Sequence, residues 1–145
     1  MSFQLRVGQV RAAKPKRKLK NYKLKHSRLL TCFSAIAYIL TVFIHNKTVT
    51  PDDAIEMVKL TPMERLEFVK KSFSTDEAVS SLINQSVDHY TRFLYETGKD
   101  KESLISLFKD RDKVKALDHY AFGDTIHEML RMIGKNSLMY RIIVV

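Results

Sequence analysis

Residues 29–44 read LLTCFSAIAYILTVFI, sixteen consecutive residues without a charged side chain. A helix of this length rises about 24 Å, which is less than the roughly 30 Å of a bilayer's hydrocarbon core. Thr31, Ser34 and Thr41 also dilute its apolar character. We therefore expect a helix that is buried on most sides in a protein core. A transmembrane span is the alternative, because the basic residues before it would suit an anchor that follows the positive-inside rule.

Helix start signals recur after this stretch. Residues 50–53 read TPDD, which is typical of a capped start with proline at the first helical position and acids in the first turn. Thr61 and Glu64 have the spacing of a capping box. Ser74 or Thr75 is expected to cap a long third segment. The region therefore reads as a series of helices.

Further apolar stripes with helical spacing continue towards the C-terminus. Gly98 is expected to end the long segment, Gly123 a later one, and Gly134 the last helix, which would start at Asp124. The chain holds only 4 Gly and 3 Pro among its 145 residues, so most of it can be regular structure. We predict an all-α (mainly α) fold, a compact bundle of six to seven helices, with residues 29–145 as a single domain. The stripes contain Leu104, Leu107, Phe108, Val114, Leu117, Ile126, Met129, Leu130 and Ile133.

The N-terminal region, residues 1–28, is predicted to be a basic arm. Phe3, Leu5 and Val7 alternate with other residues and suggest a short strand over 2–8, which could pair with a β-branched tail at 138–145. Nine of the eighteen residues in 11–28 are Lys or Arg. Because such charges repel each other and Pro15 interrupts a helix, we expect the arm to be disordered or to become ordered on binding.

The positive charge is concentrated in this arm. Residues 1–51 contain 11 Lys or Arg and no acid, whereas residues 52–145 contain the other 14 basic residues and all 16 acids. This asymmetry favours a polyanionic partner, and nucleic acid above all, without distinguishing DNA from RNA. Tyr22 could stack on a base. The expected binding residues are Arg11, Lys14, Lys16, Arg17, Lys18, Lys20, Tyr22, Lys23, Lys25 and Arg28.

Residues 60–98 allow two interpretations. In the first, Asn84 and Gln85 form a turn and the next helix presents His89, Thr91 and Arg92 as a recognition helix. This order of signals resembles the DNA-binding helices of response regulators and sigma factors, although Gln85 stands where those proteins have a hydrophobic turn residue. The second interpretation is favoured: one unbroken amphipathic helix of about 22 residues. Its stripe would be Val79, Ile83, Val87, Tyr90 and Leu94.

Catalytic and metal-binding signals are weak. The ionisable residues clustered between 118 and 128 could in principle supply ligands or a general base, but His119 and His127 are eight residues apart across Gly123. We therefore expect neither an enzyme, nor a cofactor, nor a metal site. The cluster consists of Asp118, His119, Asp124, His127 and Glu128.

The combined pattern favours a non-enzymatic nucleic-acid-binding protein, such as a regulator or an accessory subunit of a nucleoprotein complex. Cys32 is the only cysteine, which suits a reducing compartment: the cytoplasm, or the nucleus in a eukaryote. One alternative is a membrane-associated protein anchored through residues 29–44, with the arm on anionic lipid. The other is a protein–protein interaction module that binds another chain.

Overall fold

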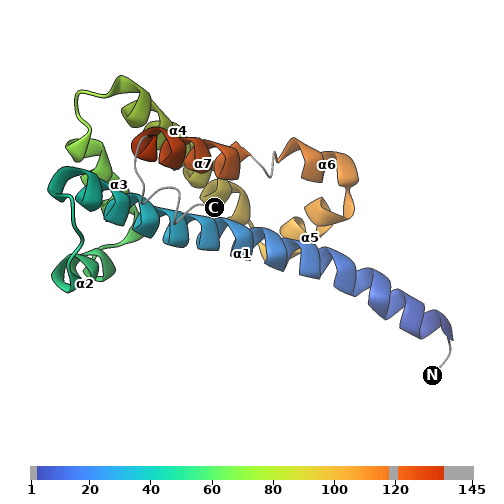
Figure 1. Ribbon diagram of the computed structural model, residues 1–145. Helices are drawn as coiled ribbons and strands as arrows, with labels where there is room; N and C mark the ends of the chain where they lie inside the picture. Colours follow the sequence, from blue (N-terminus) through green and yellow to red (C-terminus); the bar gives the residue numbers. More distant parts are fainter. Residues whose placement is uncertain (1–2, 118–120, 136–145) are drawn as a thin grey trace.

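The fold is an all-α bundle, as predicted (Figure 1). The computed structural model describes the backbone of residues 3–117 and 121–135, and the side chains of residues 14–115, 117 and 121–135. These residues form seven helices and no strand. The helices are α1 (Phe3–Asn46), α2 (Pro51–Lys59), α3 (Pro62–Ser72), α4 (Glu77–Thr97), α5 (Lys101–Lys109), α6 (Arg111–Ala116) and α7 (Ala121–Gly134).

Helix α1 is the longest element, and the other helices are arranged along it. It packs against α2, α3, α4, α5 and α7, while α4 and α7 pack closely against each other. Figure 1 shows its N-terminal end extending past α5, away from the rest of the bundle. Residues 29–44 lie in the C-terminal half of α1, where they form part of the core as expected.

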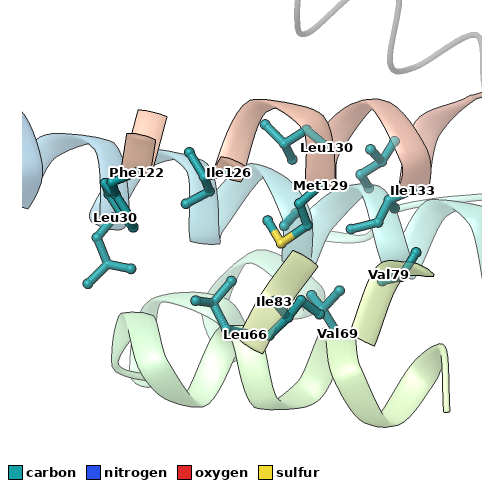
Figure 2. Packing of buried hydrophobic residues seen from close by; sticks show 12 residues of the cluster. Leu30, Leu66, Val69, Val79, Ile83, Phe122, Ile126, Met129, Leu130 and Ile133 are labelled. Atoms are coloured by element: carbon teal, nitrogen blue, oxygen red, sulfur yellow. The ribbon is translucent and has the colours of Figure 1, made fainter. Parts of the chain in front are cut away.

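The larger hydrophobic cluster joins α1, α3, α4 and α7. Figure 2 shows the side chains of α7 facing Leu66 and Val69 of α3 across this core, with Val79 and Ile83 of α4 beside them. Each fully buried aliphatic or aromatic side chain contributes about 1.5–3 kcal/mol to folding, so this cluster is the main source of stability. Its buried members are Leu30, Ala37, Leu40, Leu66, Val69, Val79, Ile83, Phe122, Ile126, Met129, Leu130 and Ile133.

The polar residues of the uncharged stretch are also buried in the bundle. Thr41 Oγ1 donates a hydrogen bond to the Ala37 carbonyl oxygen at 2.7 Å, and Ser34 Oγ donates to that of Thr31 at 3.2 Å. These hydroxyls tolerate burial because carbonyl oxygens of their own helix accept their hydrogen bonds.

Within the described residues, α1 is the one helix long and apolar enough to cross a membrane, and 39% of its most apolar window is buried inside the fold.

The N-terminal arm, expected to be disordered or to become ordered on binding, is helical in this structure, where residues 3–28 continue α1 without interruption. The strand expected over 2–8 is wrong, because residues 3–8 belong to this helix. Pro15 lies inside the helix, at a buried position, although proline in a helix interior removes one backbone hydrogen bond and costs about 3 kcal/mol. A stripe of buried positions three or four residues apart offsets that cost. These positions are Pro15, Leu19, Tyr22, His26 and Leu30.

A second hydrophobic cluster covers this stripe. Leu19 and Tyr22 of α1 pack with Phe93 of α4 and with Leu104 and Phe108 of α5. Half-buried residues of α5 and α6 surround them. The density of lysines suggested that residues 11–28 could not pack, but one apolar residue in every three or four is enough to attach a helix to a bundle.

The predicted helix starts are largely confirmed. Thr50 and Thr61 cap α2 and α3, and each belongs to a complete capping box. The cap of α4 is Asp76, rather than Ser74 or Thr75, and its side chain accepts a hydrogen bond from the Val79 amide. Gly98 ends α4 as expected. Gly123 was expected to end a helix but lies inside α7, and the predicted strand at 138–145 lies outside the described residues.

Helix α4 confirms the interpretation of residues 77–97 as one helix. Asn84 and Gln85 are exposed residues in its middle, so the turn of a helix-turn-helix is absent there. The buried stripe differs slightly from the predicted one. Phe93 faces the core, whereas Leu94 is 52% exposed, because the side chain of Phe93 packs against α1.

Candidate nucleic-acid interface

The basic side chains of α1 lie on the outer side of the helix. All eight basic residues from 14 to 28 are exposed, and we call this set the basic face. Because the helix rises about 1.5 Å per residue, the basic face extends for about 21 Å. Arg11 belongs to the same helix, but its side chain lies outside the described residues. The basic face consists of Lys14, Lys16, Arg17, Lys18, Lys20, Lys23, Lys25 and Arg28.

Because this segment is helical, its positive side chains lie on one side of α1. The apolar stripe faces the bundle, so the lysines and arginines between its members point outwards. The basic face is therefore a row of exposed positive side chains along one side of α1.

Tyr22 is not available to stack on a base, contrary to the sequence-based expectation. Its side chain is only 6% exposed. Its ring centroid lies 5.4 Å from that of Phe93 and 5.5 Å from that of Phe108. Burial raises the pKa of the Tyr22 phenol, and the carboxylate of Glu96 raises it further. Tyr22 thus attaches α1 to α4 and α5.

His26 has a similar structural role one turn later. It is 3% exposed, and its ring stacks on Phe93 and Phe122. Its Nδ1–H donates a hydrogen bond to the Tyr22 carbonyl oxygen at 3.0 Å. These contacts fix the position of the basic face relative to α4 and α7.

A groove runs beside the basic face, between α1 and the start of α5. It has a volume of about 590 Å³, and its apolar lining consists of Leu19, Leu24, Leu104 and Ile105. Five lysines line it, and we call it the lysine groove. Lys16, Lys20 and Lys23 come from α1, whereas Lys99 and Lys101 come from the turn between α4 and α5.

Sequence reasoning missed Lys99 and Lys101. They flank Asp100 in a short turn, and nothing in that local pattern connects them to residues 16–23. The signal that links them is the packing of α5 on α1 through Leu104 and Phe108. The groove combines residues from two distant segments, so it depends on the packing of α5 on α1. The positions of the lysines in the sequence do not reveal that contact.

The residues of the candidate recognition helix lie in the C-terminal half of α4. Thr91 and Arg92 are exposed, whereas His89 is half-buried. His89 and Arg92 line a cavity of about 70 Å³ next to His26, far smaller than the roughly 300–1,000 Å³ of typical ligand pockets. Residues 89–92 are therefore part of the long helix α4 rather than of a separate helix.

The cluster considered for metal binding or catalysis is only partly described. Asp118 and His119 lie outside the described residues. Within the described part of the chain, no group of three or more His, Cys, Asp or Glu side chains could hold a metal ion. Glu128 is engaged by Arg131, whose Nε donates to Glu128 Oε2 at 2.8 Å, and this bond lowers the pKa of Glu128.

Comparison with known proteins gives no match: no protein-family model, curated protein or solved structure shows significant similarity to this chain.

Proposed function

We propose that this protein binds nucleic acid through backbone phosphates, as a non-enzymatic regulator or accessory subunit of a nucleoprotein complex. The observation that carries the proposal is the basic face, eight exposed lysines and arginines along about 21 Å of one helix. Each such side chain can neutralise a phosphate and release a condensed counterion. Binding of this kind is strong at low salt and depends little on sequence.

The attachment of the helix supports the proposal. A disordered arm loses conformational entropy when it binds, whereas α1 already holds its charges at fixed positions through Leu19, Tyr22 and His26. Lys99 and Lys101 extend the positive surface beyond α1. The rest of the bundle would then provide shape and contacts to other proteins.

Charge substitution on the full-length protein tests this function. The variant carries glutamine in place of Lys14, Arg17, Lys18 and Arg28, all exposed members of the basic face. We expect weaker binding to duplex and single-stranded DNA, and a shallower dependence of the logarithm of the binding constant on the logarithm of salt concentration. The slope should change by up to about 0.9 per lost phosphate contact on duplex DNA.

The matched control removes four positive charges elsewhere. Glutamine replaces Lys71, Lys109, Arg111 and Lys115, which are exposed residues of α3, α5 and α6. If both variants lose affinity equally, the net charge and not the basic face is responsible. If the unmodified protein binds no nucleic acid at low salt, the proposal is wrong.

A second candidate function is association with an anionic membrane surface. The observation that favours it is the long apolar half of α1, the candidate span within the described residues. Insertion would have to separate Ala37 and Leu40 from the core that encloses them. Co-sedimentation with vesicles that contain phosphatidylserine, compared with neutral vesicles and with DNA, distinguishes the two functions.

A further inference from the structure

We infer that the lysine groove accommodates a single nucleic-acid strand, and that the protein prefers single strands to duplexes. This inference deepens the proposed function and rests on it. It adds a strand preference and three residues outside the basic face, Tyr95, Lys99 and Lys101.

The apolar part of the groove lining favours an unstacked strand. Leu19, Leu24, Leu104 and Ile105 line about 590 Å³ of open space together with the lysines. In a duplex, the faces of the bases are stacked on one another, so apolar side chains gain nothing from them. A single strand can place a base or a sugar against these side chains while its phosphates meet the lysines.

The rim is positive on both sides. Lys16, Lys20 and Lys23 follow one wall at intervals of about 6 Å and 4.5 Å along the helix axis, as expected from four- and three-residue steps. Lys99 and Lys101 stand on the opposite wall. A strand lying in the groove would therefore meet ammonium groups from two helical segments, whereas a duplex could contact only the rim.

Two carboxylates close to the rim leave this positive character in place. Glu96 Oε2 accepts a hydrogen bond from Lys99 Nζ at 3.1 Å, so it neutralises one of the five lysines. Asp100 is occupied as the cap of α5: its carboxylate oxygens accept from the Ser103 amide at 3.0 Å and the Ser103 hydroxyl at 2.6 Å. The remaining lysines still outnumber these acids.

Tyr95 supplies an exposed aromatic ring near Lys99, although it is not one of the residues that line the groove. Its side chain is 74% exposed. Lys99 Nζ, which belongs to the groove, lies 6.0 Å from the centroid of the Tyr95 ring. Proteins that bind single strands combine a positively charged groove with exposed aromatic rings on which bases stack. We assign to Tyr95 the stacking role that the buried Tyr22 cannot perform.

Fluorescence anisotropy with the full-length protein tests the inference. The probes are a short oligodeoxythymidylate, a duplex of equal length, and the same strand with vesicles containing phosphatidylserine as competitor. We expect the strand to bind about tenfold more tightly than the duplex, and Tyr95→Ala to lose about tenfold in affinity for the strand alone. Tyr95→Phe, which retains the ring, should bind like the unmodified protein.

A second variant tests the lysines of the α4–α5 turn. Lys99→Gln combined with Lys101→Gln should reduce the salt dependence of single-strand binding by about 0.7 in the logarithmic slope, as expected for the lost phosphate contact of Lys101, because Lys99 is already paired with Glu96. The control combines Lys59→Gln with Lys109→Gln. Lys59 is paired with the glutamate three residues before it, as Lys99 is, and neither control residue lines the groove.

The outcomes separate this inference from the proposed function. Equal binding of strand and duplex, with no effect of the Tyr95 and Lys99/Lys101 variants, would overturn the single-strand inference and leave phosphate binding by the basic face intact. Binding of neither nucleic acid would overturn both. Displacement of the strand by anionic vesicles at equal phosphate concentration would assign the groove to lipid and overturn the inference.

Discussion

The imidazole ring of His26 lies parallel to the phenyl ring of Phe93, with centroids 4.5 Å apart and planes inclined by 6°. This contact joins the basic segment of α1 to α4. Tyr22 contacts both rings, and Phe122 of α7 also stacks on His26. The most basic part of the chain is thereby anchored by aromatic packing, and its charges are displayed from a rigid support.

Replacing His26 by alanine should destabilise the protein by about 2 kcal/mol, because it removes ring contacts with Phe93 and Phe122 and leaves a cavity. Urea denaturation followed by circular dichroism measures the change in the free energy of unfolding. Ser27→Ala is the control, since Ser27 is the exposed neighbour. An equal effect of both substitutions would contradict the anchoring role of His26.

Alkaline pH should destabilise the fold through Tyr22. Burial first, and Glu96 second, raise the pKa of Tyr22 in the folded protein above its ordinary value of 10.0. The contribution of Tyr22 is therefore fully present below pH 10 and is lost as pH rises from about 10 through the folded pKa, because the unfolded chain releases its proton first. Thermal denaturation between pH 8 and pH 11, compared with that of Tyr22→Phe, isolates the contribution of Tyr22 to the pH dependence of stability. An identical decline in the variant would assign the effect to other groups.

Arg65 should be essential for the junction of α1, α2 and α3. Its Nε donates to the Met57 carbonyl oxygen at 3.0 Å, and its Nη1 donates to the Thr31 carbonyl oxygen at 3.2 Å. Arg65→Met keeps much of the volume but removes these charged hydrogen bonds, so we expect a loss of about 2–3 kcal/mol in the free energy of unfolding. Chemical denaturation measures it. Arg111→Met, at an exposed site of α6, should change stability by less than about 0.5 kcal/mol.

Two leucines of α1 allow a matched comparison of its inner and outer sides. Leu19 is buried in the second cluster, whereas Leu24 is 38% exposed between basic residues. Leu19→Ala should cost about 2–4 kcal/mol and accelerate hydrogen exchange of the amides of residues 14–28, because it weakens the attachment of that segment. Leu24→Ala should leave exchange there nearly unchanged. A larger effect of Leu24→Ala than of Leu19→Ala would contradict the assignment of Leu19 to the inner side of α1.

The burial of Leu19, Tyr22 and His26 determines which variants can test the function. Deletion of residues 11–28 would remove Leu19, Tyr22 and His26 from the core together with the charges. A loss of binding could then result from unfolding of the bundle. Substitution of exposed lysines and arginines removes charge while the buried stripe is retained, so it addresses the basic face alone.

The sequence by itself determined the features that depend on interactions within one or two helical turns. The capping boxes of Thr50 and Thr61 bond a side chain to a backbone amide three residues away, so their residue types predict both helix starts. The periodicity of residues 77–97 predicted one continuous helix, and the uncharged stretch predicted a core helix. The concentration of positive charge in the first third of the chain is likewise a property of the sequence.

Only the tertiary structure decided the conformation and packing of the basic segment. Lysine density and Pro15 indicated disorder, because charge repulsion and proline act locally, whereas the burial of Leu19, Tyr22 and His26 depends on rings and leucines supplied by α4, α5 and α7. The position of Lys99 and Lys101 opposite Lys16 and Lys20 has the same origin. Hydrophobic burial joins residues without regard to their separation along the chain, so it can reverse a local preference and assemble a site from distant segments.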